Sequence, residues 1–210
     1  MISARKRRIN FFLKTNKRLL KGLIVDLGGS KKFKETNKHL FNDSNKYFSV
    51  NKDKNSKCDH ISNFPDINLP KNYADNVLCL ETIEYISDPI KFLKNIHELL
   101  KKNGYLIISS PFMFPIHHDY ESDYYRLSIS FYKKHLDELF HFEKIVTTGG
   151  LFEILFDSIR IKFSYKINFI NKFFLLIWSI LRPIFTFLDF CIFKDNHYVN
   201  SGYILVLKKI

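Results

Sequence analysis

The sequence has few cysteines, and their arrangement excludes two classes of small protein. Cys58, Cys79 and Cys191 are odd in number and no two have the CxxC spacing, so neither a zinc cluster nor a disulfide scaffold is expected. We therefore expect a reducing compartment. Apolar residues make up 46% of the 210 positions and 22 of them are Phe, which excludes disordered, collagen-like and low-complexity chains.

The net charge of +12 is unevenly distributed along the chain. Residues 1–25 contain eight bases and no acid, residues 26–149 contain 17 of each, and residues 150–210 contain eight bases and four acids. A neutral body thus lies between two basic ends, of which the second is also the most apolar stretch. This distribution favours an anionic membrane surface over nucleic acid as the partner.

Short apolar runs alternate with helical patterns through the middle of the chain. Strands are expected at 22–29, 47–51, 73–81, 105–110, 142–148 and 203–207, and helices at 88–104 and 130–140. In the first helix Asp88 is the N-cap and Asn103-Gly104 the C-terminal stop, which places Lys101 and Lys102 in its last turn. The alternation predicts an α/β fold with a doubly wound, mostly parallel sheet.

Two segments do not follow this alternation. Residues 1–21 predict a basic amphipathic helix, in which Lys14, Lys17 and Arg18 interrupt any apolar signal-peptide region. Residues 173–193 are almost continuously apolar and would form a helix about 31 Å long, enough to span a membrane.

Three residues argue against a simple span. Arg182 and Asp189 are charged, and Pro183 breaks helices, so two half-helices hinged at Arg182-Pro183 fit better. The sequence leaves three alternatives open: a buried helical hairpin in an enlarged core or a dimer interface, an element that dips into a membrane, and a true span.

A glycine turn follows the first predicted strand, in Val25-Asp-Leu-Gly-Gly-Ser30. Such a turn between a strand and a helix brings backbone N–H groups close to a ligand. Because it lacks the GxGxxG pattern, a nicotinamide enzyme is not indicated.

The order of motifs over residues 22–148 resembles a class I S-adenosylmethionine-dependent methyltransferase, of the methyltransferase type 11 kind. The matching runs are IVDLGGS at 24–30, YFSVN at 47–51, LPKNYADNVLCLETIEYISDP at 69–89, FLKNIHELLKKNG at 92–104, YLIISSPF at 105–112 and HHDYESDYYR at 117–126. The resemblance implies a seven-stranded, Rossmann-like sheet with a hydrophobic helical insertion before the last strand. The implied parts are an N-terminal helix (1–21), a methyltransferase core (22–150), the insertion (151–196) and the last strand of the core (197–210).

The resemblance also implies a set of residues that bind S-adenosylmethionine. They are Asp26, Gly28, Gly29, Asn51, Ser62 and Glu81. The chain departs from the family pattern at Ser30 and Lys32, which replace glycines, and at Asn51, where an acid usually binds both ribose hydroxyls. These departures leave open a catalytically inactive relative.

The polar cluster at residues 117–126 is the candidate catalytic loop, since ligands of open α/β sheets lie at this strand edge. We expect His118 to act as the base toward a hydroxyl acceptor, Asp123 to orient it, and Arg126 to bind an anionic group of the substrate. Adjacent histidines rarely converge on one ion, so no metal site is expected.

The sequence thus predicts an enzyme that transfers a methyl group from S-adenosylmethionine to a small-molecule, sugar or lipid-linked acceptor. The expected location is cytoplasmic, peripheral to the inner face of the membrane. A homodimer through residues 151–196 is a further possible assembly. The alternatives are an RNA or nucleotide methyltransferase and an inactive methyltransferase-fold partner protein.

Overall fold

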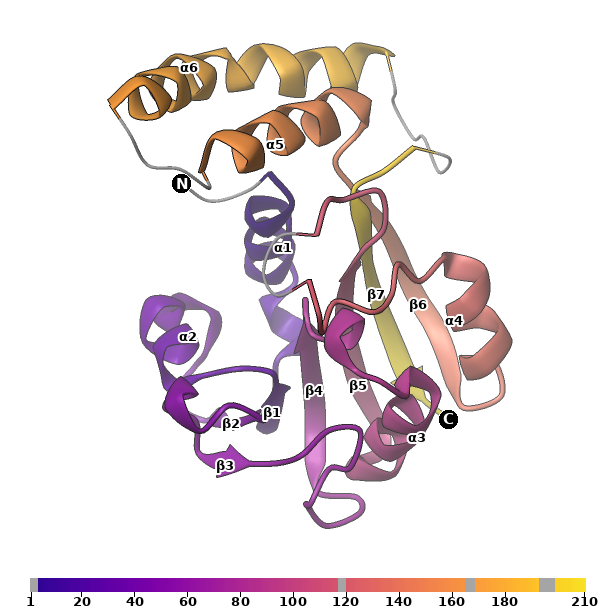
Figure 1. Cartoon of the computed structure of the whole chain (residues 1–210). Helices are drawn as coiled ribbons and strands as arrows, with labels where there is room; N and C mark the ends of the chain where they lie inside the picture. The colour runs from indigo at the N-terminus through magenta and orange to yellow at the C-terminus, as the bar shows by residue number, and fades with distance from the viewer. Residues whose placement is uncertain (1–3, 117–119, 165–168, 193–198) are drawn as a thin grey trace.

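The protein is built on one seven-stranded sheet (Figure 1). The computed structural model describes residues 4–116, 120–164, 169–192 and 199–210. In sheet order the strands are β3 (His60–Ile61), β2 (Lys46–Asn51), β1 (Leu23–Leu27), β4 (Ala74–Leu80), β5 (Leu100–Pro111), β7 (Gly202–Lys209) and β6 (Phe140–Thr148). Only β7 runs antiparallel to its two neighbours. The predicted doubly wound, mostly parallel sheet is confirmed.

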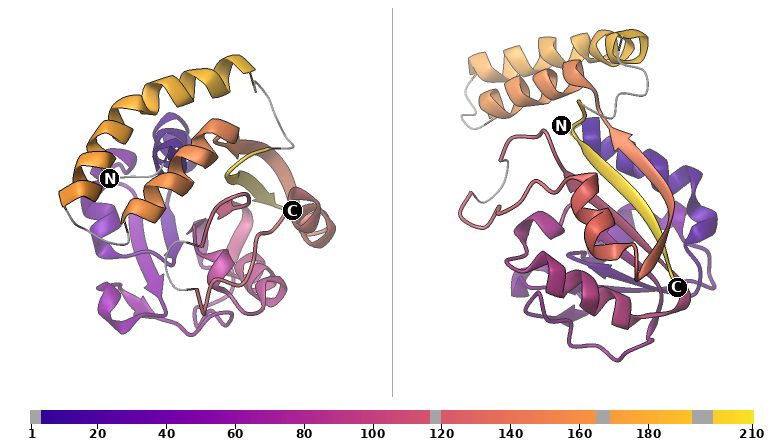
Figure 2. Two further views of the ribbon diagram at one scale, coloured as in Figure 1. Left: turned by 45° about the horizontal axis from the view of Figure 1, so that its top comes forward. Right: turned by 90° about the vertical axis from the view of Figure 1, so that its right-hand side faces the viewer.

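Helices cover both faces of the sheet (Figure 2). The helices are α1 (Ala4–Thr15), α2 (Lys31–Thr36), α3 (Pro89–Leu99), α4 (Ile129–Leu136), α5 (Leu151–Ser164) and α6 (Phe169–Ile192). Short 3-10 turns are η1 (Lys17–Leu19), η2 (Lys38–Leu40), η3 (Lys54–Ser56) and η4 (Ile83–Tyr85). One apolar core forms between the sheet and α3 with α4, and a second forms between the sheet and α1.

The N-terminal helix is part of this second core. Ile9, Phe12 and Leu13 of α1 are buried against sheet residues such as Ile24 and Ile107. The apolar side of the predicted amphipathic helix therefore packs on the sheet, and its bases, apart from the buried Arg5, face outward.

The predicted end of the helix at 88–104 is wrong. Asp88 caps α3 as expected, with its carboxylate accepting from the backbone N–H of Lys91 at 2.9 Å, but α3 ends at Leu99. Leu100 already pairs with Ala74 of β4, and the next pair in the register is Asn76 with Tyr105. Strand pairing thus ends the helix early, and the four residues 101–104 bulge from the start of β5.

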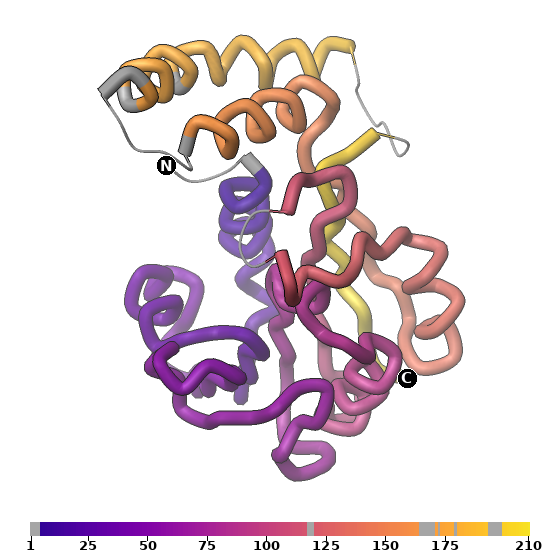
Figure 3. Tube along the Cα trace, viewed as in Figure 1, coloured from indigo at the N-terminus to yellow at the C-terminus, as the bar shows by residue number. Residues whose placement is uncertain are grey.

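The segment before the last strand forms a helical hairpin of α5 and α6, which lies across the end of the sheet (Figures 1 and 3). The rings of Phe156 and Trp178 stack between the two helices with centroids 5.2 Å apart. The predicted break at Arg182-Pro183 is wrong, because α6 is continuous with Pro183 inside it. Pro183 lies on the exposed side of α6, and Arg182 points toward α5, over Phe156.

The outer side of α6 is exposed and apolar. The segment Phe173–Ile192 is long and apolar enough to cross a membrane by length and composition, and only 6% of its most apolar part is buried. A hairpin buried within an enlarged core of one chain is therefore not what forms; a dimer interface, a membrane-dipping element and a true span remain as alternatives.

Candidate functional site

The predicted cofactor residues follow the carboxyl ends of neighbouring strands. Gly28 and Gly29 come after β1, Asn51 ends β2, and Glu81 comes after β4. Parallel pairing of these strands brings their ends to one edge of the sheet, which is where open α/β sheets bind ligands. This edge is the candidate site.

Asp26 is the buried acid of the site. It is 3% exposed and accepts a hydrogen bond from the hydroxyl of Tyr47 on β2. Burial raises the pKa of Asp26 to about 6, although the bond from Tyr47 acts in the opposite direction. Asp26 therefore faces the protein interior under the glycine turn, where its carboxylate binds Tyr47 and lies close to Gly29.

The glycine turn packs tightly on two side chains. Gly28 has φ +87°, and a Cβ there would lie 2.1 Å from Oγ1 of Thr82. A Cβ on Gly29 would lie 2.2 Å from Oδ2 of Asp26. Both glycines are thus required by the close packing of the turn at the strand edge.

Asn51 holds the same turn from the next strand. Its amide nitrogen donates to the carbonyl oxygens of Gly28 and Gly29 at 3.0 and 3.1 Å, and its oxygen accepts from the N–H of Asp53 at 3.1 Å. Both amide protons are therefore already used by the backbone. The predicted role of Asn51 at the ribose stays a prediction.

Ser62 is 1% exposed, and its hydroxyl is used within its own loop. It donates to the carbonyl oxygen of Asp66 at 2.9 Å and accepts from the N–H of Asn68 at 3.1 Å. The side chain thus shapes the loop after β3, and an adenine contact of this residue stays a prediction.

Glu81 is held between β5 and α1. It has φ +54°, accepts from the hydroxyl of Ser109 at 3.0 Å, and forms an ion pair with Arg5. The guanidinium of Arg5 also lies 4.0 Å above the centre of the Phe114 ring. The side chain of Glu81 is 24% exposed and that of Arg5 only 3%, so the carboxylate is the accessible member of the pair.

Glu84 is a second carboxyl group behind Glu81. It is 1% exposed, and neither of its oxygens has a hydrogen-bond partner among the described residues. Burial, reinforced by the charge of Glu81, raises the pKa of Glu84 to about 8. The turn η4 directs this side chain inward, and its raised pKa favours the neutral carboxyl group at pH 7.

The structure brings Asp123 and Arg126 together as partners of each other. The guanidinium forms a two-pronged ion pair with the Asp123 carboxylate, one contact being 2.8 Å, and also donates to the carbonyl oxygen of Phe114 at 3.1 Å. This pairing raises the pKa of Arg126 further. The predicted roles of this pair toward base and substrate stay predictions, and His118 lies outside the described residues.

Sequence reasoning missed Arg5 as a residue of the site. It was counted among the N-terminal bases that favour a membrane, yet it is buried and paired with Glu81. Helical spacing could have revealed its burial, though not its partner, because Arg5 precedes Ile9 by four residues and Phe12 by seven and so shares their buried face.

The charges of this edge fit S-adenosylmethionine, which carries an ammonium, a sulfonium and a carboxylate at its methionine end. Glu81 offers a partly exposed carboxylate to the ammonium, and the Nε–H of Arg5 is a buried donor with no acceptor among the described residues. When bound, this cofactor supplies a methyl group on a positively charged sulfur. Among the described residues no three His, Cys, Asp or Glu side chains come together as a metal site.

Comparisons with known proteins agree with this geometry. The methyltransferase domain family matches residues 6–144. A SAM-dependent methyltransferase from Archaeoglobus fulgidus superposes with a TM-score of 0.62 at 15% identity, over 97% of this chain and 94% of that one. One from Aquifex aeolicus has a TM-score of 0.51 at 19% identity, over 65% and 82%.

The same fold occurs in a protein of another activity. The [4+2]-cyclase SpnF superposes with a TM-score of 0.63 at 12% identity, over 96% of this chain and 80% of that one. No curated protein sequence matches the chain. The family match covers more than half of the chain: it belongs to the methyltransferase domain family and is an S-adenosylmethionine-dependent methyltransferase.

Proposed function

We propose that this methyltransferase acts on a sugar or lipid-linked acceptor at the cytoplasmic face of a membrane, which it binds through α6. The observation that carries the proposal is an uncharged apolar stripe on the outer side of α6, at the same end of the sheet as the candidate site (Figure 1). A cytoplasmic location is supported by Cys191 on α6, which is a free and exposed thiol. Such thiols stay reduced in the cytoplasm.

The stripe has helical spacing. Its members are Phe173, Ile177, Ile180, Ile184 and Phe187, each three or four residues after the previous one and 43% to 68% exposed. Full burial of such a side chain is worth about 1.5–3 kcal/mol, so partial insertion of the stripe into lipid would give several kcal/mol. Exposed apolar patches of this extent mark interaction surfaces.

The two charged residues between Phe173 and Ile192 both face α5. Arg182 approaches Asp157 at 3.9 Å, and the carboxylate of Asp189 accepts from the N–H groups of Phe152 and Glu153 at 2.9 and 2.8 Å. Together with Pro183, these were the residues that argued against a simple span. Because they point inward, α6 can lie on a membrane without burying a charge in lipid.

Exposed bases accompany the stripe. Lys6 and Arg7 are exposed at the start of α1, below the hairpin. Besides burial, the charge of Arg7 lowers the pKa of Arg182, so Arg7 lies near α6. Each base near an anionic leaflet contributes about 1 kcal/mol, which complements the apolar stripe.

Helix α1 connects this surface to the candidate site. Arg5 pairs with Glu81 at the strand edge, and Arg8, one turn further, pairs with Glu153 of α5 at 2.9 Å. A membrane against α6 would therefore lie at the end of the molecule where the cofactor residues are gathered. This placement favours an acceptor whose reactive group is held close to a lipid surface.

Vesicle sedimentation tests the membrane surface. The full chain is expected to sediment with vesicles of phosphatidylcholine and phosphatidylglycerol, and less with phosphatidylcholine alone. Ile180→Asp, at a position 68% exposed, should abolish most of this binding, whereas Ile210→Asp, at a position 66% exposed on the last residue of the chain, should not. Equal effects of the two variants would contradict the proposal.

The oligomeric state distinguishes the competing explanation of the stripe. If α6 instead forms a homodimer, the protein without lipid sediments as a dimer, and Ile180→Asp converts it to a monomer while vesicle binding is absent from both. That result would replace the membrane by a second copy of the chain.

Methyl transfer itself is tested with labelled S-adenosylmethionine and a short glycolipid, either in anionic vesicles or as its free sugar. Label is expected in the glycolipid, with a higher rate on vesicles, and the rate should fall in Ile180→Asp. Cofactor binding without transfer to either acceptor would exclude the proposed substrate class. A chain that binds no cofactor would be an inactive relative.

A further inference from the structure

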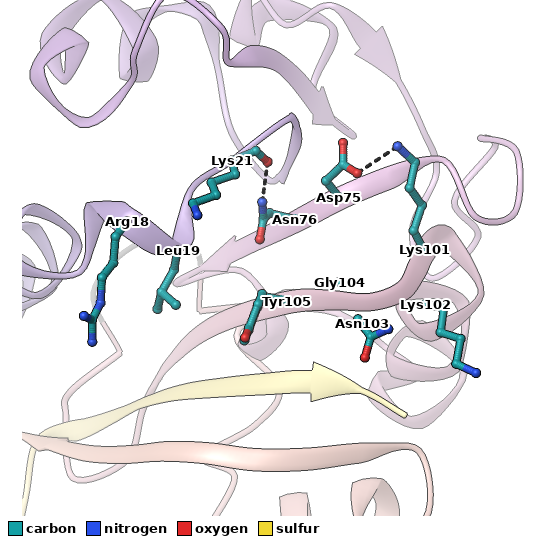
Figure 4. A pocket seen from close by; sticks show the side chains of 10 residues that line it. All are labelled: Arg18, Leu19, Lys21, Asp75, Asn76, Lys101, Lys102, Asn103, Gly104 and Tyr105. Atoms are coloured by element: carbon teal, nitrogen blue, oxygen red, sulfur yellow. Dashed lines mark hydrogen bonds and ion pairs between the residues drawn. The ribbon is translucent and has the colours of Figure 1, made fainter.

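Glu84 is a buried acid without a partner at the strand edge of the candidate site. Among the described residues it is the one acid whose two carboxyl oxygens are both buried and lack a hydrogen-bond donor. By contrast, Asp75 near the start of β4 binds Lys101 at 2.8 Å and the N–H of Leu23 at 2.7 Å (Figure 4). Buried polar groups without partners are uncommon in native proteins. A perturbed carboxyl group in such surroundings is typical of functional sites.

Two ion pairs lie near Glu84. The first joins Arg5 of α1 to Glu81, three residues before Glu84, and the second joins Asp123 to Arg126 in the loop before α4. Burial raises the pKa of Glu84, the charges of Glu81 and Asp123 raise it further, and the charge of Arg5 lowers it. Because each pair is neutral, the two pairs together add no net charge to this cluster.

The other titratable groups that face Glu84 are uncharged. They are the thiol of Cys79 on β4, the hydroxyl of Tyr85 on η4 and the hydroxyl of Tyr132 on α4. Burial raises the pKa of each group, and the charge of Glu84 raises it further, so all three stay protonated at pH 7. The Tyr132 hydroxyl donates to the hydroxyl oxygen of Ser110 at 2.8 Å. With Glu84 protonated, the described groups of this cluster therefore carry no net charge.

S-adenosylmethionine brings a positive charge to this cluster. Its ammonium and sulfonium are positive and its carboxylate is negative, so its methionine end is positive overall. The carboxylate of Glu81, which is 24% exposed, is the accessible acid here, since the side chains of Glu84 and Asp123 are buried. An ammonium bound at Glu81 offsets the charge of that carboxylate. A positive charge within about 4–6 Å also favours the ionised form of a carboxyl group.

We propose that Glu84 balances the charge of the bound cofactor: its carboxyl group is protonated in the free enzyme and releases the proton to solvent when the positive methionine end of S-adenosylmethionine binds at Glu81. The ionised carboxylate then supplies the second negative charge that this end of the cofactor requires. Glu84 acts through Glu81 and is a positioning residue rather than a catalytic one. The proposal concerns the cofactor alone, so it does not depend on the acceptor or on membrane binding by α6.

Proton release makes cofactor binding depend on pH. The pKa of Glu84 is about 8 in the free chain, and release of the proton means that this pKa is lower in the complex. Cofactor affinity should therefore rise with pH between these two pKa values, by up to about tenfold per pH unit. Above about pH 8 the free chain has already lost the proton, and the affinity should no longer change through Glu84.

Calorimetric titration of the full chain with S-adenosylmethionine at pH 6.5, 7.0 and 7.5, in phosphate and in Tris buffer, tests the proposal. The two buffers differ in their enthalpy of ionisation, so the measured heats give the number of protons released. The parent should release about one proton more than Glu84→Gln at pH 7.0. From pH 6.5 to 7.5 its affinity should rise relative to that variant by up to about tenfold. The amino group of the cofactor titrates in both proteins and cancels in this difference.

A matched variant and a matched ligand serve as controls. Glu138→Gln removes the same group from an exposed position after α4 and should behave as the parent. The ligand 5′-methylthioadenosine keeps the nucleoside of the cofactor but carries no ammonium, sulfonium or carboxylate, and it should release no proton through Glu84.

Infrared difference spectra give a direct readout on the parent, whether or not the variant folds. At pH 7.0 the band of a protonated carboxyl group should disappear when S-adenosylmethionine binds. The spectra of Glu84→Gln should lack this change.

Three results would overturn the proposal. The first is equal proton release by the parent and Glu84→Gln, which would assign the proton to another group such as Asp26. The second is release through Glu84 with 5′-methylthioadenosine, which would show that charge is not the cause. The third is a carboxyl band that persists in the complex, which would leave Glu84 a neutral part of the fold.

Discussion

Arg5 of the first helix and Glu81 at the end of β4 form an ion pair, although 76 positions separate them in the sequence. The pair fixes the start of α1 at the strand edge, where the cofactor residues lie. Three residues further along α1, Arg8 binds Glu153 of the apolar hairpin. A single helix thus contacts both the candidate site and the proposed membrane surface.

Replacing Arg5 by Met should weaken both stability and cofactor binding. The side chain of Arg5 is 3% exposed, so its removal leaves Glu81 without its main partner, and we expect a loss of about 2 kcal/mol in the free energy of unfolding. Urea unfolding with and without S-adenosylmethionine measures both effects. Arg7→Met, on the exposed side of the same helix, is the matched control and should change unfolding by less than about 0.5 kcal/mol.

Glu84 makes the stability of the fold depend on pH. Its pKa is about 8 when folded and 4.5 when exposed, so between these values the folded chain holds a proton that the unfolded chain has released. The free energy of unfolding should therefore fall as pH rises from about 4.5 to 8 and then level off. Glu84→Gln should remove this slope and be more stable than the parent at pH 8, by on the order of 3 kcal/mol.

The pH range from 6 to 8 isolates this effect. Asp26, whose pKa is raised to about 6 from 3.8, produces a similar slope only below about pH 6. Denaturant titrations of the parent and of Glu84→Gln at pH 6, 7, 8 and 9 therefore compare the two directly. Parallel curves over this range would show that Glu84 is ionised in the folded chain.

Gly28→Ala should disrupt the turn after β1. The new Cβ would lie 2.1 Å from Oγ1 of Thr82, at a residue with φ +87°, so we expect a loss of about 2–4 kcal/mol and weaker cofactor binding. Adding Thr82→Gly should recover the steric part of the loss but not the backbone part. Strictly additive effects in this double-mutant cycle would show that the close contact is not the cause.

Asp189 fixes the hairpin by capping α5 from α6. Asp189→Asn leaves one of the two N–H groups, of Phe152 or Glu153, without an acceptor, so a local loss of about 1 kcal/mol is expected. Hydrogen exchange of both amides should become faster. Asp137→Asn removes the same charge at the exposed end of α4 and should leave these amides unaffected.

Much of the fold could be predicted because local patterns and strand pairing agree there. Strands such as β4 and β7 are short apolar runs with clear boundaries, and Asp88 caps α3 as its sequence indicates. The end of α3 could not be predicted, since Lys101 and Lys102 are good helix residues and only the pairing of Leu100 with Ala74 removes them from the helix. The continuity of α6 through Pro183 could not be predicted either, since proline inside a helix usually breaks it.

The site was predicted in its location but not in its contacts. Motif order placed Gly28, Asn51 and Glu81 at one strand edge, and the sheet brings them there. Which side chains pair with one another depends on long-range packing, as with Arg5 and Glu81, and no local pattern shows it.

The variant Asn51→Asp distinguishes two expectations for cofactor affinity, one from the family pattern and one from the hydrogen bonds of Asn51 in the structure. An acid at this position would bind ribose hydroxyls by the family pattern, and S-adenosylmethionine affinity should then rise. In the structure the Asn51 amide donates to the carbonyl oxygens of Gly28 and Gly29. A carboxylate has no protons to donate and would repel both oxygens.

From these contacts we expect Asn51→Asp to bind the cofactor about tenfold more weakly than the parent, and more weakly than Asn51→Ala. Alanine removes the two hydrogen bonds without adding a charge, so the order of the two variants in calorimetry is informative even if both lose affinity. If Asn51→Asp binds the cofactor more tightly than Asn51→Ala, the ribose contact outweighs the loss of hydrogen bonds to the turn. The turn must then rearrange when the cofactor binds. If Ala binds better, Asn51 acts by holding Gly28 and Gly29, and the neutral amide is an adaptation of this chain to a turn in which Ser30 replaces a glycine.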